Sequence, residues 1–201
     1  MFTKTDFDVF DIPDLTGRLA AVKSVLDPKF EQLAPAIQAA LSSDEMLAYA
    51  HIAQHLRRHK NPPPNTWVAF SESKRGYKMT PHIELGFWDD RLFLWLAGLA
   101  ELSDRQAFIT TMMVAPGMGN LFDQPNWQLC GNHTKKTVMP LTETNYNQLL
   151  GRYNQVATAE FLVGRIWLKG DPIFDQPDQL QQQIIETVTK LAEPYQKLNA
   201  K

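Results

Sequence analysis

Three consecutive prolines, at positions 62–64, divide the chain into two parts with different hydrophobic patterns. Before them, apolar residues recur every three or four positions, which is typical of one face of a helix. After them, apolar residues form short runs bounded by turn residues, which indicates strands. Because proline removes a backbone donor and restricts the residue before it, the change from helices to strands is expected here.

The part before the prolines predicts three helices, over residues 14–26, 28–41 and 44–58. Asp27 and Pro28 resemble an N-cap followed by proline in the first turn. Pro35 predicts a kink or break in the second helix. In the third helix, acids in the first turn and bases in the last complement the helix dipole.

The part after the prolines predicts five strands and three helices. The strands are expected over residues 66–70, 81–88, 91–99, 127–133 and 159–168, and the helices over residues 103–114, 142–154 and 177–198. A tight turn at 88–91 would join the second and third strands as a hairpin. Sequential strands with short turns predict a single α+β domain, 1–201, with a mainly antiparallel sheet of about five strands packed against helices. Its N-terminal part, 1–60, would be helical, and 61–201 would hold the sheet.

Length and composition narrow the class further. A chain of 201 residues can bury a sizeable core without a disulfide or metal, and its one cysteine, Cys130, cannot form an internal disulfide. The chain has acidic residues near the N-terminus, where a signal peptide would have an apolar run, so no signal peptide is expected. The longest apolar stretch, 92–100, is about half of what a bilayer span requires. We therefore expect a cytoplasmic protein without membrane contact.

Charge is distributed unevenly although the net charge is only −2. Among the charged residues, acids outnumber bases in residues 1–50, whereas residues 51–80 hold six bases and one acid, Glu72. Such a local excess of positive charge attracts anionic ligands. The negative net charge of the whole chain argues against a typical DNA-binding domain. The six bases are Arg57, Arg58, Lys60, Lys74, Arg75 and Lys78.

Polar side chains share one face of the second predicted strand. Alternation places His82 and Glu84 with Gly86 and Trp88, opposite the apolar residues between them. An imidazole and a carboxylate on one face of the sheet predict that this face forms the base of a binding site. The alternative is that it is an outer face in contact with solvent. Four glycines inside predicted strands allow a ligand to approach, or else mark bulges and close helix packing. They are Gly86, Gly98, Gly131 and Gly164.

Metal and nucleophile motifs are weak. His51, His55 and His59 have the four-residue spacing that lets histidines on a helix share zinc, but no further ligand completes the set. We therefore interpret them as a polar helix face and predict no metal site. No phosphate-binding glycine loop or nucleophile elbow occurs, and Cys130 is expected to be an inert core thiol.

The central segment resembles the YktB family. The resemblance rests on Arg58-x-x-Asn-Pro-Pro-x-x-Thr-Trp-Val-Ala-Phe70, on Lys74-Arg-Gly-Tyr-Lys78, on Pro81-His82 and on Asn132-His-Thr-Lys135. It extends over nearly the whole chain. It implies an α+β fold with an antiparallel sheet, and it implies no particular activity or cofactor.

The first functional hypothesis is a site for an anionic or nucleotide-like small molecule, with His82 and His133 as candidate acid–base residues. Arginine and lysine would bind phosphate or carboxylate, and aromatic rings would pack on a planar group. The alternatives are RNA or single-stranded nucleic-acid binding and a non-catalytic protein-interaction module. The predicted ligand-binding residues are Arg57, Arg58, Asn61, Trp67, Arg75, Tyr77, Lys78, His82, Glu84, His133 and Lys135.

Overall fold

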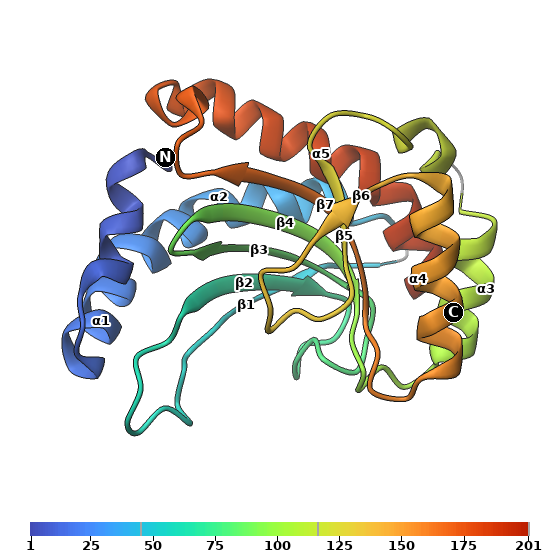
Figure 1. Cartoon of the computed structure of the whole chain (residues 1–201), viewed down its shortest axis with the longest axis horizontal. Coiled ribbons are helices and arrows are strands. Elements are labelled where there is room, and N and C mark those ends of the chain that lie inside the picture. Colours follow the sequence, from blue (N-terminus) through green and yellow to red (C-terminus); the bar gives the residue numbers. More distant parts are fainter. Residues whose placement is uncertain (45, 116, 201) are drawn as a thin grey trace.

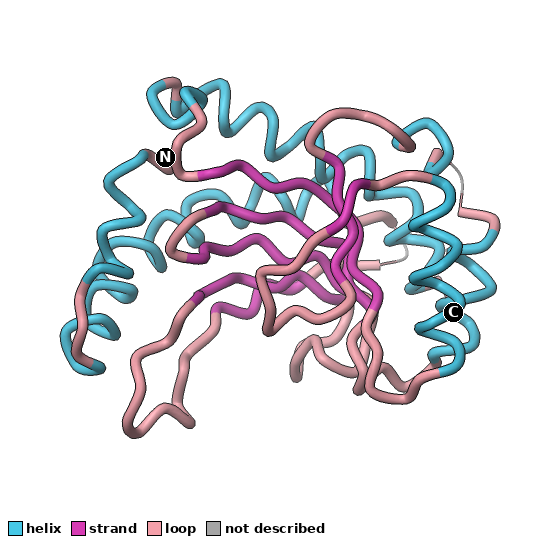
Figure 2. The backbone as a smooth tube through the Cα atoms, viewed as in Figure 1, coloured by secondary structure: helices cyan, strands magenta, loops and turns pink. Residues whose placement is uncertain are grey.

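A computed structural model describes residues 1–44, 46–115 and 117–200, and shows helices on one side of an antiparallel sheet (Figures 1 and 2). Over these residues the sheet has seven strands in the order β1-β2-β3-β4-β7-β5-β6. The strands are β1 (Tyr49–Ile52), β2 (Asn65–Ser71), β3 (His82–Trp88), β4 (Arg91–Gly98), β5 (Trp127–Cys130), β6 (Met139–Pro140) and β7 (Phe161–Leu168). The predicted class and the antiparallel sheet are confirmed, but the sheet has seven strands rather than about five.

Helices α2 and α5 cross the sheet on one side, while α3 and α4 stand at one end of it (Figure 1). Short helical segments begin the chain and connect the strands. The α-helices are α1 (Leu15–Ala21), α2 (Asp27–Leu41), α3 (Arg105–Met113), α4 (Glu143–Gln155) and α5 (Pro177–Asn199). The other segments are η1 (Lys4–Asp11), η2 (Val22–Leu26), η3 (Met118–Leu121) and η4 (Pro172–Asp175). None of the helices in the described ranges is long and apolar enough to cross a membrane.

The main core lies between the helices and one face of the sheet. Register places Leu85 of β3 opposite Val68 of β2 and Leu94 of β4, and all three side chains are fully buried. The same alternation directs the other residues of each strand to the opposite face, where loops cover a second, smaller apolar cluster. The two faces are called the helix-covered face and the loop-covered face below.

Aromatic packing holds the N-terminus against the helix-covered face. The rings of Phe2 and Phe7 each approach the Phe87 ring edge-on, with centroids 5.1 Å apart. Asp6 accepts the N–H of Thr3 and pairs with Lys29 at 2.6 Å. The N-terminal segment is therefore an integral part of the domain.

The prediction of a helix over residues 44–58 is wrong. Residues 49–52 form β1 instead, and the residues after them form a loop. β1 pairs with β2, placing Ala50 opposite Phe70 and His51 opposite Ala69. A helix here would leave the outer backbone edge of β2 without a partner, so strand pairing overrides the local helical pattern. β6 was not predicted either, because a strand of two residues, one of them Pro140, gives no periodic pattern.

The first two predicted helices form one continuous helical segment. At their junction the N–H of Asp27 donates to the carbonyl of Val22, five residues earlier, within the π-helical turn η2. Asp27 therefore does not act as an N-cap, and the extra residue of the π turn accommodates Pro28. α2 also continues through Pro35, so the expected break is not found.

Candidate functional site

An aromatic and imidazole cluster lies on the loop-covered face, where β2 and β3 run side by side. Trp67 Nε1 donates to Tyr77 Oη at 3.0 Å, and the Tyr77 ring lies edge-on to His82 with centroids 4.9 Å apart. Burial, with a smaller contribution from the charge of Glu84, raises the pKa of Tyr77 to about 12. The tyrosine is therefore a neutral hydroxyl near pH 7.

His82 and Glu84 form a buried pair beneath this cluster. His82 Nε2 lies 3.1 Å from Glu84 Oε1, and Nδ1 lies 2.8 Å from the carbonyl oxygen of Thr80. Nδ1 must donate, because a carbonyl oxygen only accepts. Both ring nitrogens of His82 are thus used internally, and the side chain is inaccessible to solvent. The predicted acid–base role of His82 is not favoured by this geometry.

His133 forms a second pair, with Glu160, which is more open. The backbone N–H of His133 donates to Glu160 Oε2 at 2.6 Å, and Nδ1 lies 2.8 Å from both carboxylate oxygens. Nε2 has no protein partner within the described ranges. Burial alone would lower the pKa of His133, but the hydrogen bond and charge of Glu160 outweigh it and raise the pKa. Glu160 therefore favours a protonated ring.

The two His–Glu pairs share one electrostatic environment. The negative charge of Glu84 also raises the pKa of His133, whereas the positive charge of Lys78 lowers it. His82, His133 and Lys78 therefore lie near one another on the loop-covered face, but His82 and Lys78 do not line the hollow beside His133. Lys78 itself is exposed and lies 3.8 Å from Glu101.

A small hollow beside His133 combines cations with aromatic rings. The space that it offers to the centre of a water-sized sphere is only about 10 Å³, room for about one water molecule. Arg91 donates to the carbonyl oxygen of Lys136 at 3.0 Å, and Lys136 lies 5.7 Å from the Trp88 ring centre and pairs with Asp89. The lining residues are Trp88, Arg91, Phe93, Trp95, Cys130, His133, Lys135, Lys136 and Val138.

Several predicted residues lie apart from this hollow. Arg57, Arg58 and Asn61 are exposed on the β1–β2 loop, and Arg75 is exposed on the β2–β3 loop. None of these four lines the hollow. Of the predicted residues, Lys135 and His133 line it, while the cluster of Trp67, Tyr77, His82 and Glu84 lies on the same face.

The three regularly spaced histidines do not share a helix face. The His51 ring lies 6.1 Å from the Tyr77 ring, and the His55 ring lies 5.7 Å from the Trp67 ring, so both join the aromatic cluster. Burial and the nearby Arg58 lower the pKa of His55 to about 4. His59 is exposed on the β1–β2 loop.

The strand glycines mark close packing. A Cβ atom on Gly164 would lie 1.9 Å from the Leu94 carbonyl oxygen, and one on Gly86 would lie 2.5 Å from that of Thr66. A Cβ at Gly98 would meet Phe108 of α3, and one at Gly131, just beyond β5, would meet a leucine of α4. These contacts support the alternative of close packing rather than an open ligand floor.

Sequence reasoning missed Glu160, Arg91 and Lys136. Glu160 is an acid beside the buried apolar run of β7, and this contrast was the available signal. No local sequence pattern indicated that Arg91 or Lys136 would be site residues. Cys130 fits its predicted inert role, because burial raises the pKa of its thiol to about 11.

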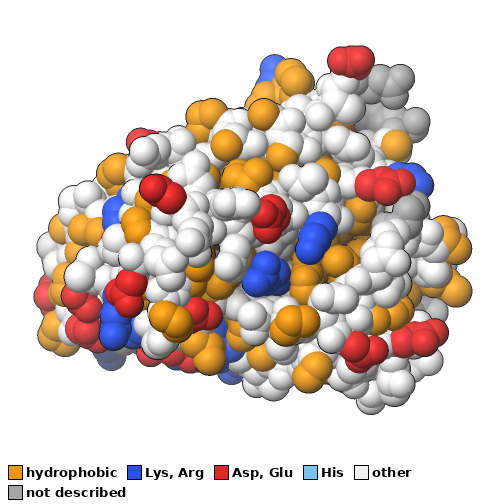
Figure 3. Space-filling view, turned by 90° about the horizontal axis from the view of Figure 1, so that it is seen from above, with side chains coloured by type: hydrophobic (Ala, Val, Ile, Leu, Met, Phe, Trp, Pro, Cys, Tyr) orange, Lys and Arg blue, Asp and Glu red, His pale blue; other side chains and the backbone are white. Residues whose placement is uncertain are grey.

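The helix-covered side differs from the loop-covered face in its charged side chains and histidines. Seen from above, its Lys and Arg side chains are scattered among acidic and uncharged ones, and no histidine is visible (Figure 3). The imidazoles and the hollow described above belong to the loop-covered face.

Comparison with known proteins identifies the family. A domain of unknown function, DUF1054, matches residues 2–195. A UPF0637 protein of Lacticaseibacillus casei is 44% identical over 200 residues, covering 98% of this chain and 97% of the relative. A UPF0637 protein of Latilactobacillus sakei is 40% identical over 202 residues and covers 100% of both chains. The chain therefore belongs to the DUF1054 or UPF0637 family, which is the YktB family.

Proposed function

We propose that the chain binds a small anionic ligand at the mouth of the hollow beside His133. The observation that carries this proposal is the geometry of His133: Glu160 holds Nδ1 and favours the protonated ring, while Nε2 has no protein partner within the described ranges. A carboxylate that orients an imidazole in this way leaves its other nitrogen ready to donate. Such a charge-assisted hydrogen bond is among the stronger polar contacts available to a ligand.

Beside His133, Lys135 is a cation available to an anion, because Arg91 and Lys136 pair with Asp90 and Asp89. Lys135 is exposed at the rim of the hollow, and the rings of Trp88 and Trp95 line it. Lysine supplies a mobile positive charge to phosphate or carboxylate. The hollow offers only about 10 Å³ to the centre of a water-sized sphere, which is room for about one water molecule, so the anion would bind across its mouth.

The proposal is tested by titrating the protein with inorganic phosphate, acetate and AMP, following thermal stability and NMR shifts of His133. We expect at least one of these anions to stabilise the wild type. His133→Gln and Lys135→Gln should each weaken binding by about tenfold, because each removes one charged contact. His59→Gln is the matched control and should leave affinity unchanged. Absence of binding, or equal losses in all three variants, would contradict the proposal.

A second candidate function is binding of RNA or single-stranded nucleic acid. It is favoured by exposed cations on three loops: Arg57, Arg58 and Lys60 on β1–β2, Lys74, Arg75 and Lys78 on β2–β3, and Lys135 on β5–β6. Phosphate contacts release counterions, so affinity should fall with salt with a log–log slope of about −0.7 per contact. Measuring affinity for oligouridylate at several salt concentrations tests this. A slope near zero would exclude it.

A further inference from the structure

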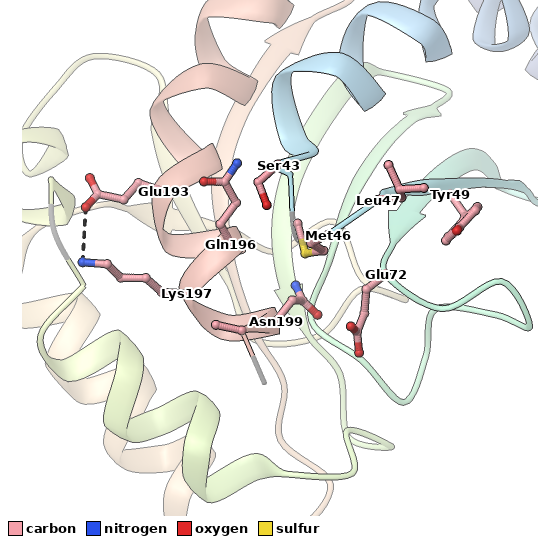
Figure 4. A pocket seen from close by; sticks show the side chains of 10 residues that line it. Ser43, Met46, Leu47, Tyr49, Glu72, Glu193, Gln196, Lys197 and Asn199 are labelled. Atoms are coloured by element: carbon pink, nitrogen blue, oxygen red, sulfur yellow. Dashed lines mark ion pairs between the residues drawn. The ribbon is translucent and has the colours of Figure 1, made fainter.

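A groove separate from the loop-covered hollow runs along the C-terminal end of α5. Two adjoining depressions form it, and they share Glu72, Asn199 and Ala200. Figure 4 shows one of them, with Asn199 at the end of α5 and Glu72 on the facing β2–β3 loop. The groove therefore has Glu72 and Asn199 near its middle.

Asn199 supplies an acceptor without a partner. Its side chain is only 7% exposed, and Nδ2 donates to the carbonyl oxygens of Tyr195 at 2.9 Å and Pro81 at 3.4 Å. These two carbonyls fix the amide orientation, because a flipped amide would place oxygen against oxygen. Oδ1 is left without a hydrogen bond to any described residue, and Figure 4 shows it on the side of Glu72. Buried acceptors of this kind normally have a donor partner.

Glu72 supplies a negative charge beside this acceptor. Its carboxylate forms no ion pair or side-chain hydrogen bond with any residue in the described ranges. Its charge contributes to the raised pKa of Tyr195, one helical turn before Asn199, whose buried hydroxyl also lacks a partner among those residues. Two acceptors thus lie at the middle of the groove: the carboxylate of Glu72, and Oδ1 of Asn199, which is shielded from solvent. A cationic donor between them would satisfy both.

The remaining charges of the groove are already paired or lie at its ends. Lys197 pairs with Glu193 at 3.2 Å, as Figure 4 marks. Lys74 lies outside the groove, over the ring of Tyr49 and 5.3 Å from its centre. In the adjoining depression Asp104 caps α3 by accepting the N–H of Ala107, and it adds a second carboxylate.

Apolar side chains lie between and beside these polar groups. Leu47 is 60% exposed in one depression and Met79 is 63% exposed in the other. A ligand suited to this pattern carries ammonium groups separated by methylenes. We propose that the groove binds a linear aliphatic diamine or polyamine, with one ammonium donating to Glu72 and Asn199 Oδ1 and its methylenes covering Leu47 or Met79.

The test uses the full chain and isothermal titration with 1,6-diaminohexane and spermidine. Both should bind saturably, whereas 1,6-hexanediol, of the same length but uncharged, should not bind. Glu72→Gln should weaken diamine binding by at least about tenfold, because it replaces a charged acceptor with a neutral one of the same shape. Glu193→Gln is the matched control in the same groove and should leave the affinity within about threefold, since Glu193 is paired with Lys197.

Three outcomes would overturn the proposal: no diamine binding by the wild type, unchanged binding by Glu72→Gln, or an equal loss in Glu193→Gln. Magnesium ion competing as strongly as the diamine would also overturn it, because the groove would then hold any cation. Glu72 lies on a loop, so circular dichroism and thermal unfolding should show that Glu72→Gln folds normally.

Discussion

His133 illustrates how one neighbouring carboxylate changes the behaviour of a histidine. Glu160 binds both its backbone N–H and Nδ1, and raises its pKa against the opposing effect of burial. For His55, by contrast, burial and then the charge of Arg58 both lower the pKa, to about 4. Burial acts in the same direction on both histidines, and their pKa values move apart because a carboxylate, Glu160, binds only His133.

The first prediction concerns the stability that Glu160 provides. A folded-state pKa above the usual histidine value of 6.5 means that protonated His133 stabilises the fold below that pH, and that this contribution is lost as pH rises through the folded pKa. Glu160→Gln should therefore lower the free energy of unfolding by about 1–3 kcal/mol near pH 5.5, and by less near pH 9. Urea unfolding at both pH values measures this.

Glu186→Gln is the control for that experiment. Glu186 is exposed on α5 and accepts a hydrogen bond from Gln182. Its substitution should change stability by less than about 0.5 kcal/mol at either pH. A penalty for Glu160→Gln that is the same at both pH values would show that the charge on His133 contributes nothing.

The second prediction concerns Asp27. Burial first, and then the nearby Glu31, raise the pKa of Asp27 to about 6, and its Oδ1 is buried without a partner among the described residues. The folded state thus favours the protonated acid, so the ionised form reduces stability above about pH 6, and this loss diminishes as pH falls towards 3.8. Asp27→Asn should raise stability by up to about 1 kcal/mol at pH 8, allowing for solvent screening, and by little near pH 4.

Asp14→Asn provides a comparison for Asp27→Asn. Asp14 is a true N-cap whose Oδ1 accepts the N–H of Gly17 at 2.7 Å. Because asparagine also caps helices, Asp14→Asn should be nearly neutral, whereas Asp14→Ala should cost about 1 kcal/mol. Thermal unfolding of the three variants at two pH values distinguishes the cases. Stabilisation by Asp27→Asn that is equal at pH 4 and pH 8 would contradict the explanation.

At the scale of elements, β4 and β7 approach each other closely at Gly164. A Cβ there would lie 1.9 Å from a backbone oxygen of β4, which cannot move without shifting the strand. Gly164→Ala should therefore destabilise the fold by about 1–3 kcal/mol. Gly151, within α4, has no atom within 4 Å of an added Cβ, so Gly151→Ala should stabilise by about 0.5–1 kcal/mol. Chemical denaturation measures both, and destabilisation by Gly151→Ala would contradict the helix argument.

Most elements could be predicted because their local patterns agree with their final packing. Alternation in β3, the continuous apolar run of β4, and the Thr142 side chain that caps α4 by accepting the N–H of Asn145 are local signals that the structure keeps. β1 could not be predicted, because its strand conformation depends on pairing with β2, which follows the proline-rich loop. A local pattern cannot report a partner distant in sequence.

At the scale of the whole molecule, the sequence predicted one ligand site containing both His82 and His133, whereas in the structure only His133 lines the hollow. His82 became buried because Thr80 and Glu84 satisfy both its nitrogens. The exposed cations of 57–60 were grouped with the site by sequence proximity, although they extend along a loop away from the hollow. Accessibility depends on how loops close over the sheet, and neither composition nor periodicity reports that.

The short strands at both ends of the sheet have a consequence for aggregation. An unpaired strand edge can template pairing with another chain, and proteins limit this with short edges and proline. β6 has two residues and includes Pro140, and β1 has four residues. We therefore expect concentrated solutions to resist edge-to-edge fibre growth, with β1 the more vulnerable end because its outer edge keeps its backbone donors.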